Sequence, residues 1–141
     1  MDPVLHGACH CGGIRMALRF TKPPPDLQVR SCQCGFCTRQ GSITVSDPAG
    51  EAVITIAPGC LTEYGFATQS GTSLLCARCG VYAGAVMEAD GKQWSIANVR
   101  GLAIPGFEGR AGDKMVYDAE AASERVARRK ARWTPTRMVE N

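Results

Sequence analysis

Apolar and polar residues alternate over residues 13–20, which is the pattern of a half-buried β-strand. One face carries Ile14, Met16, Leu18 and Phe20, and the other carries Arg15, Ala17 and Arg19. Turn-forming pairs such as Asp47-Pro48 and Asp90-Gly91 separate further segments with strand character, at residues 26–31, 42–46, 52–57, 62–67, 73–75, 81–86 and 93–97. Many short strands separated by turns predict a mainly β domain built from antiparallel sheets.

One segment, residues 119–133, has a helical pattern and contains neither Gly nor Pro. Its apolar stripe is formed by Ala119, Ala122, Val126 and Trp133, and its basic residues include Arg125, Arg128, Arg129 and Arg132. Asp118 is a suitable N-cap, and Thr134-Pro135 ends the pattern. We expect a C-terminal helix whose arginines face solvent and pair with Glu120 and Glu124. Aromatic residues are not interleaved with these arginines, so nucleic acid is not an expected partner.

Length and composition indicate an ordinary globular protein. A chain of 141 residues predicts a single domain spanning residues 1–141. Its 45% apolar and 21% charged residues and its net charge of +3 are unremarkable. The amino terminus lacks the cationic and apolar segments of a signal peptide. No apolar run reaches the roughly 18 residues of a membrane span. We therefore expect a cytoplasmic protein without a membrane partner.

The cysteines carry the clearest chemical signal. Seven of the eight fall into three clusters, which are Cys9-His10-Cys11, Cys32-Gln33-Cys34-Gly35-Phe36-Cys37 and Cys76-Ala77-Arg78-Cys79. A disulfide framework is the alternative for a short, cysteine-rich chain. Cys-x-Cys pairs have poor disulfide geometry, however, and the sequence predicts a reducing compartment. Reduced cysteines that bind zinc are the better interpretation.

Seven clustered thiolates divide unevenly between two zinc ions. Four close a tetrahedral structural site, whereas three leave a position open for water or substrate. Cys9 and Cys11 can share an ion with Cys76 and Cys79, so that Cys32, Cys34 and Cys37 form a local tripod. The rival partition places Cys9 and Cys11 with Cys32 and Cys34, and leaves Cys37, Cys76 and Cys79. The spacing leaves both partitions open.

Three further residues bear on this division. Cys60 is expected to be a small buried apolar residue. If Cys60 instead completed the middle group, that group would be a second structural zinc site. His6 and His10 flank the first cluster and are expected at the surface or beside the ligands, since four thiolates need no histidine.

Three motifs follow one another over about residues 5–100, namely Gly7-Ala8-Cys9-His10-Cys11-Gly12, Ser31-Cys32-Gln33-Cys34-Gly35-Phe36-Cys37-Thr38-Arg39 and Leu75-Cys76-Ala77-Arg78-Cys79-Gly80. Their order and spacing resemble those of the glutathione-dependent formaldehyde-activating family. This family is also called the S-(hydroxymethyl)glutathione synthase or centromere protein V family. The resemblance implies a tent-like, zinc-stapled β fold. It also implies two zinc ions per chain. The structural ion would be held by Cys9, Cys11, Cys76 and Cys79. The labile, catalytic ion would be held by Cys32, Cys34 and Cys37. Gly35 and Thr38 depart from the middle motif, which often has Ser and Arg at these places.

The function that the resemblance implies is a carbon–sulfur lyase or synthase. The thiol of glutathione would bind at the open zinc position and add to formaldehyde, or release it in the reverse direction. Zinc lowers the pKa of a bound thiol, so a thiolate is available near neutral pH. The alternatives are a non-catalytic zinc module that binds a partner, and a thiol protein that responds to oxidation or zinc.

Other charged residues are candidates for substrate contacts. Arg39 follows the tripod and is a candidate for a bidentate bond to a glutathione carboxylate. Arg30 and Arg78 are open to the same interpretation. Glu63 and Glu88 are candidate proton shuttles, although surface positions on strands explain them equally well.

Overall fold

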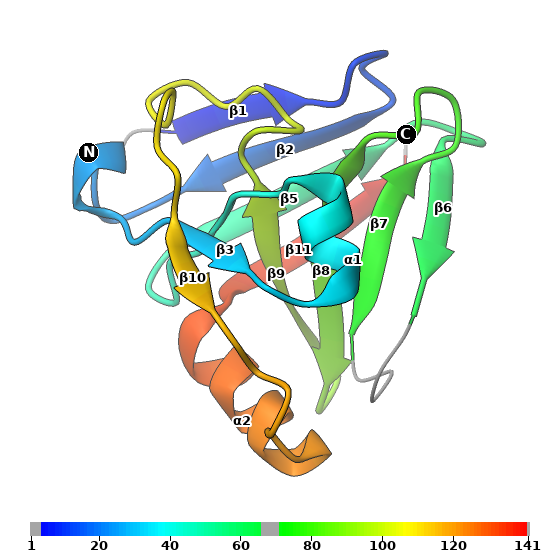
Figure 1. Cartoon of the computed structure of the whole chain (residues 1–141). Helices are drawn as coiled ribbons and strands as arrows, with labels where there is room; N and C mark the ends of the chain where they lie inside the picture. The colour runs from blue at the N-terminus through cyan, green and yellow to red at the C-terminus, as the bar shows by residue number, and fades with distance from the viewer. Residues whose placement is uncertain (1–3, 66–70, 141) are drawn as a thin grey trace.

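The computed structural model describes residues 4–65 and 71–140 and confirms the mainly β architecture with a C-terminal helix (Figure 1). The strands are β1 Val4–Ala8, β2 Ile14–Arg19, β3 Arg30–Cys32, β4 Thr44–Val45, β5 Glu51–Ile56, β6 Leu61–Tyr64, β7 Thr72–Cys76, β8 Tyr82–Ala89, β9 Lys92–Asn98, β10 Asp113–Met115 and β11 Thr134–Glu140. The helices are α1 Gly35–Gln40 and α2 Ala122–Arg132, and Pro24–Asp26 forms a 3-10 turn.

The sheet forks at β9. One edge of this strand pairs with β8 along its length, and β8 continues through β7 to β6. The other edge pairs first with β11 and then with β4. β11 leads into one wing, β5–β2–β1, while β4 leads into the other, β3–β10. Most pairs are antiparallel, as expected, but β11 with β5 and β10 with β3 are parallel. Two groups of strands, β11–β5–β2–β1 and β4–β3–β10, therefore diverge from the same edge of β9.

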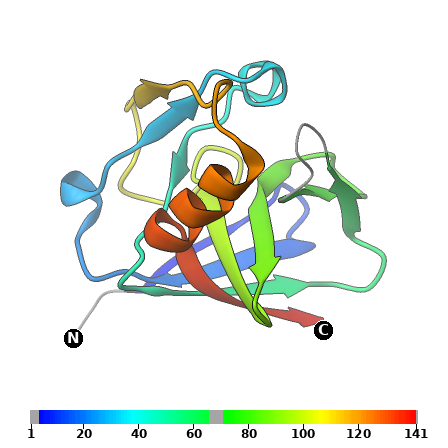
Figure 2. The ribbon, with the colours of Figure 1, turned by 90° about the horizontal axis from the view of Figure 1, so that it is seen from below.

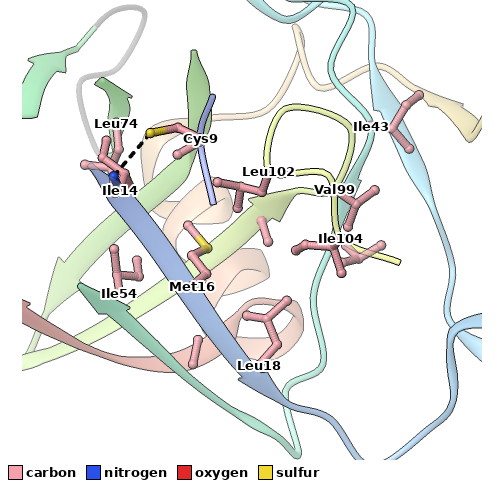
Figure 3. Packing of buried hydrophobic residues seen from close by; sticks show 14 of the residues in the cluster. Cys9, Ile14, Met16, Leu18, Ile43, Ile54, Leu74, Val99, Leu102 and Ile104 are labelled. Carbon is pink, nitrogen blue, oxygen red and sulfur yellow. Dashed lines mark hydrogen bonds between the residues drawn. The ribbon is translucent and has the colours of Figure 1, made fainter. Parts of the chain in front are cut away.

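The main core lies under the β1–β2–β5 wing. The predicted apolar face of β2 supplies Ile14, Met16 and Leu18, which are 0–2% exposed and pack with Ile54 and Leu74 (Figure 3). Burying side chains of this size contributes about 1.5–3 kcal/mol each. The alternation visible in the sequence is therefore the one that places β2 in the core.

A second buried face forms between the β8–β9 hairpin and α2. Ala85 and Met87 of β8 pack with Trp133, and Val126 of α2 packs against this cluster. Figure 2 shows α2 lying in front of these strands. β8 therefore contributes to two apolar clusters, since Val86 belongs to the main core. Among the described residues, neither helix is long and apolar enough to cross a membrane.

The end of the chain differs from the sequence prediction. Thr134-Pro135 ends the helix as expected, but it also begins β11, which lies between β9 and β5. Proline is usually confined to edge strands because it lacks an N–H donor. Here β5 pairs with β11 only from Thr136 onward, so Pro135 faces one strand, β9. The missing donor is therefore tolerated.

Helix α2 also begins later than predicted. Asp118 is not its N-cap. The Glu120 N–H donates to the Tyr117 carbonyl in a turn, and the helix starts at Ala122. The Ala121 N–H donates to the Glu124 carboxylate over 3.0 Å, which satisfies one donor at the helix start.

Several other elements differ in extent. β1, β10 and the short α1 were not predicted. The strand expected at residues 26–31 is shorter and covers Arg30–Cys32. The strand expected at residues 62–67 covers Leu61–Tyr64, and residues 66–67 lie outside the described part of the chain.

Candidate metal centre

The first and third cysteine clusters meet in one place. Cys9 and Cys11 follow β1, Cys76 ends β7, and Cys79 lies in the turn before β8. The four sulfurs lie within 4.8 Å of one another. The Sγ atoms of Cys9 and Cys11 are 3.8 Å apart, and those of Cys11 and Cys76 are 3.4 Å apart. Of the two partitions, the structure therefore brings together Cys9, Cys11, Cys76 and Cys79, which we call the four-cysteine group.

Backbone donors stabilise negative charge on these sulfurs. Ile14 N–H donates to Cys9 Sγ over 3.2 Å, as the dashed line in Figure 3 shows. Arg78 N–H and Cys79 N–H both donate to Cys76 Sγ over 3.4 Å. Such bonds favour the thiolate that a metal requires. The Gly13 backbone forms a further hydrogen bond with the Cys11 sulfur. Gly12 and Gly80 permit the turns at this group, with φ of +81° and +79°.

The geometry of this group fits zinc. Sulfurs at about 2.3 Å from a tetrahedral ion lie about 3.8 Å from each other, close to the observed separations. Cys60 is fully buried in the main core and belongs to neither cysteine group, as the sequence favoured. His6 and His10 are exposed and are absent from both groups.

Cys32, Cys34 and Cys37 form the three-cysteine group, whose sulfurs also lie within 4.8 Å of one another. Cys32 ends β3, and Cys34 is the N-cap of α1. The Cys37 N–H donates to Cys34 Sγ over 3.3 Å, so the first turn of α1 turns Cys37 back toward Cys34. No fourth Cys, His, Asp or Glu within the described ranges joins this group. It can hold a metal ion with three protein ligands, which is compatible with zinc.

Hydrogen bonding differentiates the sulfurs of the three-cysteine group. The hydrogen bond with Cys37 lowers the pKa of Cys32 to about 6, against the opposing effect of burial. The pKa of Cys37 is raised, first by its hydrogen bond to Cys32 and then by burial. Cys32 is therefore the more readily deprotonated sulfur of the group, and a metal that binds here displaces the protons that remain on the others.

The three-cysteine group opens into a cavity of about 240 Å³. The cavity is lined by residues of β3, β4, β7, β8, β9 and β10, by the segment that follows β10, and by residues of α1 and α2 and at their ends. The described residues that line it are Arg30, Cys32, Cys34, Cys37, Thr44, Gly71, Thr72, Ser73, Tyr82, Ala85, Ile96, Met115, Tyr117, Asp118, Arg125, Arg128, Arg129 and Trp133. The lining thus combines sulfur, positive charge and an apolar wall, as in small-molecule sites.

The cavity corrects the expectation of a solvated C-terminal helix. Arg125, Arg128 and Arg129 of α2 line the cavity and are half-buried. Arg128 forms two hydrogen bonds of 2.8 and 3.0 Å with Glu120, which lies eight residues earlier and outside the helix, so this pair is not one of the short-range helical pairs expected from the sequence. The Arg128 guanidinium carbon also lies 3.7 Å from the centroid of the Tyr117 ring. These contacts hold the helix arginines over the cavity.

Crowding of positive charge is evident in the pKa values of two arginines. Burial, together with Arg128 and Arg125, lowers the pKa of Arg129 to about 10. Burial is also the main reason that the pKa of Arg30 is lowered, with Arg128 and Arg132 acting in the same direction. Both groups remain charged at neutral pH. The cavity is therefore electropositive beside the sulfurs.

Tyr82 is a site residue that sequence reasoning missed. It is buried, it lines the cavity, and its ring packs edge-on against Phe36 with centroids 5.1 Å apart. Burial, and then the charges of Cys37, Cys32 and Cys34, hold its pKa above the usual range. Its hydroxyl is thus a proton donor at neutral pH. Nothing in the local sequence distinguishes Tyr82 from a core residue.

Other predicted contact residues lie outside the cavity lining. Arg39 is exposed on α1 and donates to the Gly35 carbonyl over 2.8 Å. Arg78 is exposed beside the four-cysteine group. Glu63 and Glu88 are exposed strand residues. Arg30 is the one arginine proposed from the sequence as a substrate contact that does line the cavity.

Comparison with known proteins supports the fold. No family model matches the chain. The crystal structure of a Rhodobacter sphaeroides protein is similar, with 27% sequence identity and a TM-score of 0.56. The match covers 79% of this chain and 98% of that one. The same fold therefore exists in a bacterial protein of known structure, and the family resemblance of the motifs remains a prediction.

Proposed function

We propose that this protein is a zinc-dependent carbon–sulfur lyase or synthase that acts on the adduct of glutathione with formaldehyde. One observation carries the proposal. The group with three sulfurs lines the cavity, and none of the four-cysteine group is among the described residues that line it. A zinc site with three protein ligands keeps a position for substrate, and a four-ligand site is structural.

Cys32, Cys34 and Cys37 fit zinc in number, sulfur chemistry and mutual distance. An ion held there would supply a position for the substrate sulfur and would lower the pKa of that thiol. The cavity residues act on the rest of the substrate. The apolar wall, including Ala85 and Ile96, excludes water, and the arginines attract a substrate with negative charge.

The reaction conserves atoms and electrons without an oxidant. In the synthetic direction the substrate thiolate adds to the carbonyl carbon of formaldehyde, and a C–S bond forms. The carbonyl π electrons move to oxygen, which takes a proton and becomes the hydroxyl of a hemithioacetal. In the lyase direction the hydroxyl loses its proton, the C=O bond forms again and the C–S electrons return to sulfur.

Tyr82 is the candidate donor of that proton. Its buried hydroxyl stays protonated and shares the cavity with all three ligand sulfurs. A donor aimed at the oxygen that gains charge stabilises the transition state. The exposed positions of Glu63 and Glu88 make them weaker candidates for this role.

The test is the exchange of glutathione with its formaldehyde adduct, followed by NMR exchange spectroscopy. Cys34→Ser should abolish the enzymatic part of the exchange while the four-cysteine group keeps its zinc. Cys60→Ala is the matched control, because it removes a cysteine that belongs to neither group. Exchange that continues unchanged in Cys34→Ser would exclude a lyase at this site.

A redox-responsive thiol protein is the second candidate, and two observations favour it: the three sulfurs lie within 4.8 Å of one another, and the pKa of Cys32 is lowered by its hydrogen bond with Cys37. A thiolate next to a second sulfur forms a disulfide readily. Mild oxidation would then release zinc and link two of Cys32, Cys34 and Cys37, which mass spectrometry of the alkylated protein would detect. Zinc retained under such conditions would leave the lyase as the better proposal.

A further inference from the structure

The charge of the cavity lining is unbalanced. Among the described residues, four arginines line it, namely Arg30, Arg125, Arg128 and Arg129, and Asp118 is the only carboxylate of that lining. Asp118 is exposed, whereas the arginines are buried or half-buried. Glu120, which is not among the described lining residues, pairs with Arg128 and Arg125. Buried charges are stable when they are paired, so this excess of positive charge calls for an anion.

Arg30 is the most buried of these four arginines and has no carboxylate partner among the described residues. It is 9% exposed. Its guanidinium donates to the Ser46 hydroxyl through one nitrogen. A guanidinium has five N–H donors in a planar fork that matches a carboxylate. Arg30 therefore retains donors for a planar anion on the cavity side.

The volume of the cavity limits the size of the ligand. Arg30 and Cys32 belong to β3 and are separated by one residue, so both side chains lie on the same face of the strand. The cavity of about 240 Å³ is just below the range of sites for drug-sized ligands. A compact molecule can thus reach both the sulfurs and the arginine.

We propose that the cavity selects thiols that carry a carboxylate a few atoms from the sulfur, with Arg30 as the residue that recognises the carboxylate. This inference rests on the proposed function, because it places the ligand's sulfur at the three-cysteine group. Arg128 and Arg129 add positive charge around the same anion. A mercaptocarboxylic acid and the carboxylate-bearing end of a peptide thiol such as glutathione share this chemistry.

Calorimetric titration of the zinc-loaded protein with matched thiols tests the inference. 3-Mercaptopropionate should bind at least tenfold more tightly than 3-mercaptopropionamide, which has the same size and no charge. Glutathione is the third probe. If it binds more tightly than 3-mercaptopropionate, the ligand is the peptide thiol, and if it binds more weakly, the ligand is the small acid. Equal affinities for the acid and the amide would overturn the inference without any variant.

Variants locate the carboxylate. Arg30→Gln should reduce the preference for the acid to less than threefold, whereas Arg19→Gln, which removes an exposed charge from β2, should preserve it. Arg128→Gln serves as a second variant if Arg30→Gln does not fold, and it should weaken the preference severalfold. A preference that survives both cavity variants, or that disappears in Arg39→Gln instead, would contradict the assignment.

A fourth probe separates this inference from the proposed function. 3-(Methylthio)propionate keeps the carboxylate and has no thiol. If it binds as tightly as 3-mercaptopropionate and Arg30→Gln weakens it, the carboxylate site stands and the role of the three-cysteine group fails. If the acid and the amide thiols bind equally tightly, the role of the three-cysteine group stands and the carboxylate site at Arg30 fails.

Discussion

Cys76 and Cys37 are both buried, yet they connect very different lengths of chain. Cys76 belongs to the four-cysteine group, which joins the loop after β1 to the turn between β7 and β8. Cys37 belongs to a group contained within six residues around α1. A crosslink between distant segments restricts the unfolded chain far more than a local one. Folding energy should therefore depend on the first group and chemistry on the second.

The two cysteines should accordingly differ in their effect on stability. Cys76→Ser opens a closed metal staple and is expected to cost at least about 3 kcal/mol, or roughly 10 °C in Tm for a chain of this size. Cys37→Ser is expected to lower Tm by less than half as much. Thermal unfolding followed by circular dichroism measures both. Equal Tm values would show that the two groups carry equal structural weight.

Tyr82 should affect rate without affecting metal content. Tyr82→Phe removes the hydroxyl and keeps the ring that packs against Phe36, so we expect the exchange rate to fall about 100-fold. Zinc content should not change. Tyr64→Phe is the control, since Tyr64 is exposed and its ring lies on Phe36 with centroids 5.5 Å apart. An exchange rate that is unchanged in Tyr82→Phe would exclude the Tyr82 hydroxyl as the proton donor.

At the residue scale the sequence predicts ligands better than it predicts their surroundings. Short spacing forces Cys32, Cys34 and Cys37 together, so their proximity is a local property. Arg30 and Arg129 come from β3 and α2, at opposite ends of the chain, and their meeting depends on the tertiary fold. The periodicity of the sequence does not indicate that Arg30 and Arg129 lie close together in the folded protein. The solvated helix was the natural but incorrect expectation.

At the scale of elements, α2 depends on one carboxylate for its placement. Glu120 precedes the helix and binds Arg128 through two hydrogen bonds, while its Oε1 lies 3.4 Å from Arg125 Nε. The hydrogen bond from Arg128 is the main reason that the pKa of Glu120 is lowered. A lowered carboxyl pKa stabilises the fold above the unfolded-state pKa, and this contribution is lost as the pH falls.

Glu120→Gln should therefore destabilise the protein in a pH-dependent way. At pH 7 we expect a loss of about 1–2 kcal/mol, because the charged hydrogen bonds are only partly exposed to solvent. The difference from the wild type should narrow as the pH falls below the unfolded-state pKa of about 4.3, because Glu120 then takes up a proton in the unfolded chain before it does so in the folded protein. Urea unfolding at pH 7 and pH 4 measures it. A difference that is constant with pH would mean that the Glu120 charge does not hold α2.

The predicted elements are most accurate where one face is buried. β2 and β5 match their expected positions because apolar residues alternate with polar ones along them, and the apolar residues are those that the core buries. β10 has three residues and pairs in parallel with β3, so no local signal marks it. β11 contains a proline that normally argues against a central strand. The proline is tolerated because β5 pairs with β11 only from Thr136 onward, so that Pro135 has β9 alone as a neighbouring strand.

At the scale of the whole molecule, the fork at β9 creates the site. The β11 wing buries the main core, and the β4–β3 wing brings Arg30 and Cys32 above the opposite face of the β8–β9 hairpin. α2 then closes this second face with its arginines. The two cysteine groups thus occupy different structural settings, one joining strands at the edge of the core and one lining the cavity.

Zinc content, measured before and after a challenge with a chelator, tests this division most directly. The wild type should contain two zinc ions per chain, one of which is removed readily while the fold remains intact. Cys34→Ser should contain a single, chelator-resistant ion. A wild-type protein with one zinc ion, or with two that resist the chelator equally, would contradict the assignment of one closed and one open site.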